Sequence, residues 1–293
     1  MLLRLIIILI VFFSGLPIKA EELRISQLSD RPKKDFTELR PMVRYAAQHI
    51  KSPTIDSFKV RLFKKFETLC SAIKTGKTDW ITETAYVAAR LQQECGAIPI
   101  AVKWKKQQKQ YRSLIFSKTT TDIDSLYKLP GKVLAVESEN SFSSFYIPLK
   151  AIQNKGLHIK RLHSPRNRPN DDEVGYFFSR NEKNNVKMVL KGIVDAGAIN
   201  DGDWNNLSII SKHEKQQLRI IYRSKPYPRS FELVSPMLSQ SKREALKALL
   251  FNKHGEIPED ILRRYENSSG FGPITTEHND LLLNIAHSRE DWK

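Results

Sequence analysis

Apolar and polar positions follow two different rhythms along most of the chain. Short apolar or alternating runs, which predict strands, lie at residues 23–28, 58–62, 80–81, 97–104, 114–116, 133–136, 194–199 and 218–222. Between them apolar residues recur at helical spacing, which predicts helices at residues 41–50, 63–76, 86–93, 145–154 and 182–191. This alternation of strands and helices predicts an α/β fold with parallel strands.

Proline, glycine and serine positions predict where several helices begin and end. Pro41 suits a first helical turn, because proline lacks an N–H group that would have no partner there. Gly76 suits the cap after a helix C-terminus. Ser241 and Glu244 have the spacing of a capping box, which predicts a helix start in the mostly helical tail.

Two segments far apart in the chain share one plan. In AIKTGKTDWITETAY (residues 72–86) and in VLKGIVDAGAIND (residues 189–201), a helix ends, a glycine and an aspartate follow at the same spacing, and a strand begins. This repetition predicts two lobes that are built alike. We expect the two aspartates, Asp79 and Asp195, to be structural residues of the turns.

The residues that follow each repeated segment are candidates for ligand contact. In open α/β sheets, ligands bind beyond the carboxyl ends of the strands. Thr82 and Thr84 come after the Gly–Asp turn of the first segment, and Asn200 comes after that of the second. We therefore expect these side chains to lie near the ligand.

The first twenty residues have the layout of a secretory signal. Arg4 precedes an apolar run at residues 5–13, and Pro17 and Ala20 follow it. The run is too short to span a bilayer comfortably, so we expect export and cleavage after Ala20. An uncleaved anchor is the alternative. Export places the mature chain, residues 21–293, in the periplasm.

Charge and composition narrow the set of partners. The chain has 293 residues and 40% hydrophobic content, which is enough for one large core or two smaller ones. Its formal net charge of +16 favours anionic partners. Simple solvation of the lysines and arginines is the alternative. No long basic block is present and the chain is expected to be exported, so we expect no nucleic-acid partner.

Cysteine and histidine usage predicts no metal and no cofactor. Cys70 and Cys95 could form one disulfide in an oxidising compartment, or each could be a buried free thiol. The seven histidines show no metal-binding spacing, and the sequence has no P-loop, GxGxxG or GxSxG motif.

A serine cluster is the main candidate for ligand binding. Ser141, Ser143 and Ser144 fall between the strand expected at residues 133–136 and the helix expected at residues 145–154. Free backbone N–H groups and the helix dipole favour an anion at a helix start, and serine hydroxyls add hydrogen-bond donors. The alternative is that one serine only caps the helix.

Four segments together resemble a known family. They are YRSLIFSK (residues 111–118), LYKLPGKVLAVESENSFSSFYIP (126–148), VLKGIVDAGA (189–198) and IIYRSKPYP (220–228). In order and spacing they look like the phosphonate, phosphate and phosphite-type periplasmic substrate-binding proteins of ABC importers. The resemblance covers most of the mature chain.

The resemblance implies a two-lobed type II periplasmic binding protein fold. Two crossing strands, expected near residues 113–118 and 218–224, would join the lobes, and the ligand cleft would lie at the lobe interface. The first lobe would comprise residues 21–115 and 219–293, and the second lobe residues 116–218. We expect a monomer.

The resemblance also implies a function without catalysis. A small anion, such as a phosphonate, phosphate or phosphite, would bind in the cleft and close the lobes, and an ABC permease in the inner membrane would receive it. The expected ligand-binding residues are Ser141, Ser143, Tyr111, Ser144, Thr82, Thr84 and Asn181.

The sequence departs from the family pattern at two places. The family's Ser-Thr-Ser-Gly reads Ser141-Phe142-Ser143-Ser144 here. In the second lobe, the position of a family histidine falls on Glu182 or, with a shifted alignment, on Arg180. A carboxylate would repel an anion and a guanidinium would bind it, so the two alignments predict different sites.

Two other functions remain to be considered. A sensory module of the same fold would report to a membrane sensor kinase, and a neighbouring kinase gene in place of permease genes would favour it. An enzyme would use Ser141 or Ser143 as nucleophile, but the sequence has no base at recognisable spacing, and we expect no enzymatic activity.

Overall fold

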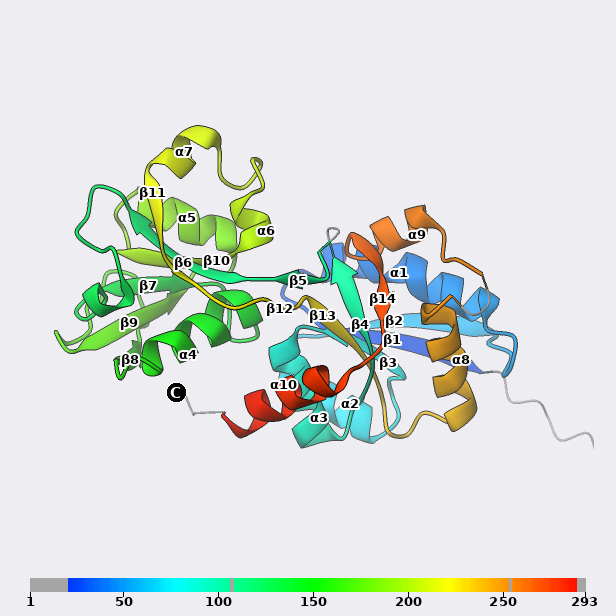
Figure 1. Ribbon diagram of the computed structural model, residues 1–293. Helices are drawn as coiled ribbons and strands as arrows, with labels where there is room; N and C mark the ends of the chain where they lie inside the picture. Colours follow the sequence, from blue (N-terminus) through cyan, green and yellow to red (C-terminus); the bar gives the residue numbers. More distant parts are fainter. Residues whose placement is uncertain (1–20, 106–107, 253–254, 289–293) are drawn as a thin grey trace, which may run out of the picture.

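A computed structural model describes residues 21–105, 108–252 and 255–288 of the chain. The segment expected to be the signal, residues 1–20, lies outside these described residues. Two six-stranded sheets, each covered by helices, form two lobes that a narrow two-stranded ribbon joins (Figure 1). None of the helices in the described ranges has the length and apolar character needed to cross a bilayer.

The first lobe contains a mixed sheet with the strand order β14-β4-β13-β3-β1-β2. β1 is parallel to β2 and β3, and β13 is antiparallel to β3 and β4. Its strands are β1 (Glu22–Leu28), β2 (Ser57–Phe63), β3 (Trp80–Glu83), β4 (Ile98–Lys105), β13 (Ser230–Val234) and β14 (Ser268–Gly272). Its helices are α1 (Pro32–His49), α2 (Phe66–Lys74), α3 (Ala85–Cys95), α8 (Gln240–Leu250), α9 (Glu259–Arg264) and α10 (Thr276–His287).

The second lobe contains a sheet with the strand order β11-β6-β10-β7-β9-β8. Its strands are β6 (Ser113–Lys118), β7 (Val133–Val136), β8 (His158–Arg161), β9 (Glu173–Phe178), β10 (Ala196–Asn200) and β11 (Leu218–Arg223). Its helices are the 3₁₀ turn η1 (Leu126–Lys128), the π-helical turn η2 (Phe142–Tyr146), α4 (Ile147–Gln153), α5 (Glu182–Leu190), α6 (Asp201–Trp204) and α7 (Lys212–Gln216).

The two lobes share one strand order. In the first lobe β2, β1, β3, β13 and β4 lie side by side, and in the second β9, β7, β10, β6 and β11 lie in the corresponding places. In each sheet one strand directly follows a strand of the ribbon. These strands, β13 and β6, are antiparallel to their neighbours β3 and β10. The two-lobed α/β fold expected from the sequence is therefore present.

The repeated Gly–Asp segments have the same role in both lobes. The Asp79 carboxylate accepts a hydrogen bond from the backbone N–H of Arg24 near the start of β1, at 2.8 Å. The Asp195 carboxylate accepts the equivalent bond from Val133 at the start of β7, also at 2.8 Å. Each aspartate thus ties the turn before one strand to the start of the neighbouring strand, and both are structural residues, as expected.

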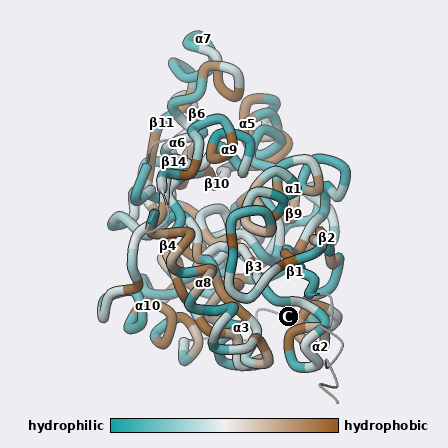
Figure 2. Tube along the Cα trace, turned by 90° about the vertical axis from the view of Figure 1, so that its right-hand side faces the viewer, coloured by the Kyte–Doolittle hydropathy of each residue, from teal (hydrophilic) through white to brown (hydrophobic). Residues whose placement is uncertain are grey.

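Apolar side chains fill both faces of the two sheets. Buried residues of β1, α1 and α8 form one cluster, including Ile25, Val43 and Leu249, and β6 and α5 contribute to another, with Phe116 and Val186. In Figure 2 hydrophobic and hydrophilic segments alternate along the tube, as expected for amphipathic helices on a buried sheet.

The connection between the lobes lies closer to the first lobe than expected. β6 and β11 pair with each other in the second sheet along their length. The ribbon that crosses between the lobes is instead β5 (Gln110–Tyr111) paired with β12 (Tyr227–Pro228). We therefore propose that the second lobe begins at β6 and ends after β11. The lobe boundaries, expected at residues 115 and 219, would then lie at the two strands of the ribbon.

Two predicted helix starts are wrong. Pro41 lies inside α1, which begins with Pro32 in its first turn, so the better-placed proline had been overlooked. The helix of the tail begins after Ser239, whose side chain accepts from the backbone N–H of Lys242, and not at the Ser241–Glu244 pair. The observed starts lie nine residues before Pro41 and two residues before Ser241.

Cys70 and Cys95 form a disulfide between α2 and the end of α3, with a Cα–Cα distance of 5.3 Å. The bond closes a loop with a sequence separation of 25 residues. It therefore restricts the unfolded chain, which is the main way a cross-link of this kind stabilises a fold.

Replacing both cysteines by serine is expected to lower the free energy of unfolding by about 3 kcal/mol, the loop-closure value for this length. Urea unfolding of the oxidised wild-type chain and of the Cys70→Ser/Cys95→Ser variant measures the difference. Reduction of the wild-type chain should give the same loss. Equal stability of all three forms would contradict the structure.

Candidate functional site

The ribbon leads directly into β6 of the second sheet and β13 of the first, so the two sheets approach each other beside it. Among the described residues, hydrogen bonds cross between the lobes there. Thr84 Oγ1, at the start of α3, donates to the Asn140 carbonyl at 3.4 Å, and Arg229 Nη1, before β13, donates to Asn200 Oδ1 at 3.3 Å. We call this region the interlobe site. Its members are Tyr111, Glu137, Ser141, Ser143, Glu182, Asn200 and Arg229.

Aromatic rings fill the contact between the lobes beside the interlobe site. Tyr86 of α3 stacks on Tyr146 of the second lobe with ring centroids 4.7 Å apart. Phe142 packs edge-on against Tyr227 of the ribbon at 5.2 Å and is 1% exposed. Phe142, which replaces the family's threonine, is thus part of the packing between the second lobe and the ribbon.

The serine cluster forms a helix start, as expected. Ser141 is the N-cap residue of η2, and its hydroxyl accepts from the backbone N–H of Ser144 at 3.2 Å. The Ser141 hydroxyl also donates to the Glu137 carboxylate. Ser141 therefore links the end of β7 to the helix start and acts as a cap, the simpler of the two roles considered for it.

Tyr111, Ser143 and Arg229 come together at the centre of the interlobe site. The Tyr111 hydroxyl is hydrogen-bonded to the Ser143 side chain. The Arg229 guanidinium lies over the Tyr111 ring, with Cζ 4.5 Å from the ring centroid. Burial raises the pKa of Tyr111, although Arg229 opposes the effect, so the phenol stays a neutral donor at physiological pH.

Three of the other expected ligand residues have their polar groups occupied within one lobe. Ser144 Oγ donates to the Ala198 carbonyl at 2.8 Å and accepts from Asn185 Nδ2 at 3.1 Å. Thr82 Oγ1 donates to Glu232 at 3.0 Å beneath the first sheet. Asn181 caps α5 by accepting from the backbone N–H of Asn184 at 2.8 Å. The structure does not bring these three to the interlobe site.

The second lobe presents Glu182, and not Arg180, to the interlobe site. Glu182 is buried, and its two carboxylate oxygens accept from the backbone N–H and the Nδ2 of Asn200, at 3.0 and 2.6 Å. Arg180 is exposed and has a positive φ of 77°. Of these two residues, Glu182 is therefore the one that lies at the interlobe site.

Burial acts on the pKa of both acidic groups of the interlobe site. It raises the pKa of Glu182, and the neighbouring Glu137 and Asp203 raise it further. Burial also raises the pKa of Glu137, against the Ser141 hydrogen bond and the charge of Arg31. A raised pKa increases the share of the uncharged form of a carboxyl group, which repels an anion less than a carboxylate does.

Arg229 is the residue of the site that sequence reasoning missed. It is 8% exposed, and its Nε has no hydrogen-bond partner among the described residues. A buried charged donor without a partner is costly. The only signal in the sequence was its place after PYP, at the return of the chain to the first sheet.

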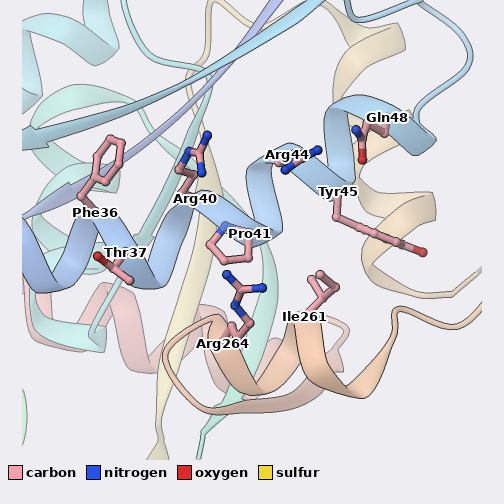
Figure 3. Close-up of a pocket in the computed structure, with 9 residues that line it drawn as sticks. All are labelled: Phe36, Thr37, Arg40, Pro41, Arg44, Tyr45, Gln48, Ile261 and Arg264. Carbon is pink, nitrogen blue, oxygen red and sulfur yellow. The ribbon is translucent and has the colours of Figure 1, made fainter.

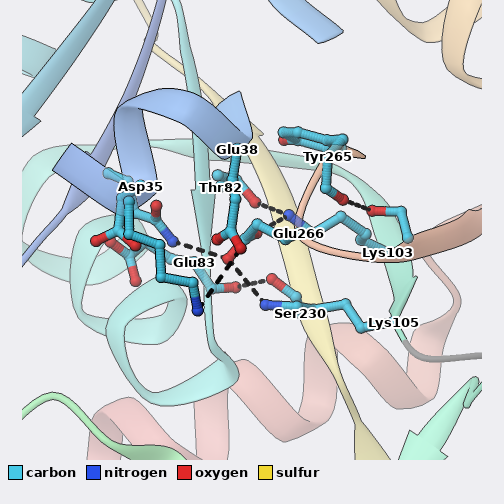
Figure 4. A network of polar contacts seen from close by, with 12 residues as sticks. Asp35, Glu38, Thr82, Glu83, Lys103, Lys105, Ser230, Tyr265 and Glu266 are labelled. Carbon is cyan, nitrogen blue, oxygen red and sulfur yellow. Dashed lines mark hydrogen bonds and ion pairs between the residues drawn. The ribbon is translucent and has the colours of Figure 1, made fainter. Parts of the chain in front are cut away.

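A buried charge network supports the first lobe at the edge that faces the interlobe site (Figure 4). Lys103 of β4 is fully buried and contacts Thr82 of β3, Glu232 of β13 and Glu266 before β14. Glu232 also accepts from Tyr265 at 3.0 Å. Although burial alone would lower the pKa of Lys103, Glu232 and Glu266 raise it.

Glu83 ends β3 beside this network. Its carboxyl accepts from the backbone N–H of Leu28 at the end of β1, at 2.7 Å. Burial raises the pKa of Glu83 to about 8. The group is therefore largely protonated at neutral pH, and it connects the ends of two neighbouring strands as an uncharged side chain.

Solved structures with a similar fold indicate the class to which this protein belongs. The chain resembles solved structures of two-lobed binding proteins. XAC2383 from Xanthomonas citri bound to chloride ion has a TM-score of 0.85 and 24% identity, over 91% of this chain and 96% of that chain. The same protein bound to ATP has a TM-score of 0.85 and 22% identity, over 92% and 96%.

PhnD1 from Prochlorococcus marinus in complex with methylphosphonate has a TM-score of 0.66 and 16% identity, over 91% of this chain and 97% of that chain. These likenesses show the type II periplasmic binding protein fold. No curated protein gave a significant sequence match.

The sequence profile of one family matches residues 31–279, which is most of the chain. This protein belongs to the ABC transporter, phosphonate, periplasmic substrate-binding protein family. In the described residues, no group of three or more histidine, cysteine, aspartate or glutamate side chains could hold a metal ion.

Removing Lys103 should be far more costly than removing its neighbour Lys105. Lys103→Met leaves Glu232 buried without its cation, and we expect a loss of about 3–5 kcal/mol in the free energy of unfolding. The Lys105 side chain is 22% exposed, so Lys105→Met should cost less. Chemical denaturation of both variants tests this, and equal losses would show that the network does not support the sheet.

Glu83→Gln should change how stability depends on pH. The folded-state pKa of Glu83, about 8, lies above its ordinary value of 4.5, so the folded state binds the proton more tightly. Glu83 therefore destabilises the wild-type fold progressively as pH rises from about 4.5 to about 8, and glutamine removes this loss.

Denaturation at a series of pH values measures this effect. The variant should gain stability relative to wild type over that range. The control is Glu67→Gln at an exposed carboxylate, whose stability curve should run parallel to that of wild type. A parallel curve for Glu83→Gln as well would mean that Glu83 is ionised in the fold.

Proposed function

We propose that this chain is an extracytoplasmic binding protein for a small oxyanion of the phosphonate, phosphate or phosphite type, which it delivers to an ABC permease. The observation that carries this proposal is Arg229, a buried guanidinium with an unpartnered Nε between the two lobes. An oxyanion is the partner that a guanidinium binds best, because the two can form parallel charge-assisted hydrogen bonds.

The groups around Arg229 suit an anion taken from water. Tyr111 and Ser143 supply hydroxyls, and burial raises the pKa of Glu182, which favours its uncharged form. The family to which the chain belongs, and the anions in the similar structures, methylphosphonate in PhnD1 and ATP or chloride in XAC2383, support an anionic ligand.

Lobe contacts explain how binding could be reported to a membrane partner. Arg229 directly precedes β13 of the first lobe, and its side chain donates a hydrogen bond to Asn200 of the second lobe. A ligand held by Arg229 on one side and by Ser143 on the other favours the arrangement in which the lobes touch. We further propose that residues 1–20 direct export and are removed, and that the mature protein is a monomer.

Calorimetric titration with phosphate, phosphite, methylphosphonate and 2-aminoethylphosphonate tests the ligand class. We expect at least one to bind, and Arg229→Gln to weaken that binding by about a hundredfold, because it removes a charged donor from a buried site.

The matched control is Arg223→Gln, which removes an exposed arginine at the end of β11 and should leave affinity unchanged. No binding of any of the four anions at millimolar concentration would overturn the ligand class. Equal affinities of the wild-type chain and Arg229→Gln would remove Arg229 from the site.

A further inference from the structure

A pocket lies on the first lobe, between α1 and α9. Its volume is about 350 Å³, and Figure 3 shows the residues that line it. Three of them are arginines, Arg40 and Arg44 from α1 and Arg264 from α9. None of its lining residues belongs to the interlobe site.

The three arginines bring positive charge together without an internal counterion. Their side chains have no hydrogen bond or ion pair with any other residue in the described part of the chain, and Arg40 only lies over the Phe58 ring at 6.0 Å. The acidic residues nearest along α1 are already engaged, Asp35 with Ser29 and Glu38 with Lys34.

The three arginines are exposed residues that line the same pocket. Arg40 and Arg44 are four residues apart and therefore lie on the same side of α1, where like charges repel. In Figure 3 the Arg264 side chain extends from α9 towards Pro41, in the middle of α1. Two helices that contact each other thus line one pocket with three arginine residues.

The shape and composition of the pocket favour one ligand chemistry. Guanidinium groups bind phosphate oxygens through paired hydrogen bonds, and three of them suit a ligand with several phosphate groups better than one with a single charge. A volume of about 350 Å³ is within the usual range for small-molecule sites and exceeds what one phosphate fills. Phe36 and Tyr45 add ring surface at the rim.

We propose that this pocket, with Arg44 and Arg264 as its main anchors, is a second anion site that binds a soluble di- or triphosphate group. It is separate from the interlobe site. Arg44 lies about 20 Å along α1 from Arg31, whose charge acts on Glu137 of the interlobe site. The pocket could therefore be occupied whether or not the lobes hold a ligand.

Calorimetric titration of the full chain with pyrophosphate and tripolyphosphate, without divalent cations, tests the proposal. In the Arg229→Gln chain, whose interlobe site is weakened, tripolyphosphate should bind more tightly than orthophosphate. Arg44→Gln/Arg264→Gln should weaken binding of tripolyphosphate at least tenfold, because two charge-assisted anchors are lost. Arg44→Lys/Arg264→Lys keeps the charge but loses the paired geometry, so its affinity should be intermediate.

The control for general charge is Arg263→Gln/Lys59→Gln, which removes the same number of charges from exposed positions outside the pocket. It should bind like the wild-type chain, and Arg229→Gln should do the same. An equal loss in the charge control would overturn the proposal in favour of diffuse attraction. A loss in Arg229→Gln alone would place the ligand at the interlobe site. No binding of tripolyphosphate at millimolar concentration would also overturn it.

Discussion

The ion pairs of Lys103 with Glu232 and Glu266 are the constraint on which the first lobe depends. Lys103 and Glu232 are fully buried, 3.2 Å apart at their charged atoms, on two neighbouring strands. Because an uncompensated charge there would cost several kcal/mol, β4, β13 and the segment before β14 must keep their register. That register places Glu83 and Arg229 at the edge that faces the second lobe.

The second lobe reaches the same edge by a different kind of interaction. Its helix start is held by hydroxyl and amide bonds, from Ser113 to the Ser143 carbonyl at 2.5 Å and from Ser144 to the Ala198 carbonyl at 2.8 Å. Neutral hydrogen bonds of this kind fix the backbone without adding charge. The charged donor of the interlobe site, Arg229, therefore comes from the residue between β12 and β13, where the chain enters the first lobe. The second lobe contributes hydroxyls and carboxyls.

Sequence patterns were reliable where a single local rule governs the structure. The alternation of strands and helices, the repeated Gly–Asp turns and the helix start at Ser141 were all predicted and are present. Predictions failed where two local candidates competed, as for Pro32 and Pro41. Sequence patterns also left open the partners of individual side chains. Thr82 and Ser144 follow buried strands, as ligand residues should, but their hydroxyls turn into their own lobes.

The sequence by itself determined the fold class, the repeated lobe plan and the family. Hydrophobic periodicity and turn residues act over a few neighbouring positions, so the order of strands, helices and turns can be read along the chain. The tertiary structure alone decided which polar side chains meet. Arg229 and Tyr111 are far apart in sequence and touch only through the pairing of β5 with β12. The disulfide, the choice of Glu182 over Arg180 and the arginine pocket between α1 and α9 likewise depend on helix and strand packing, which no local pattern encodes.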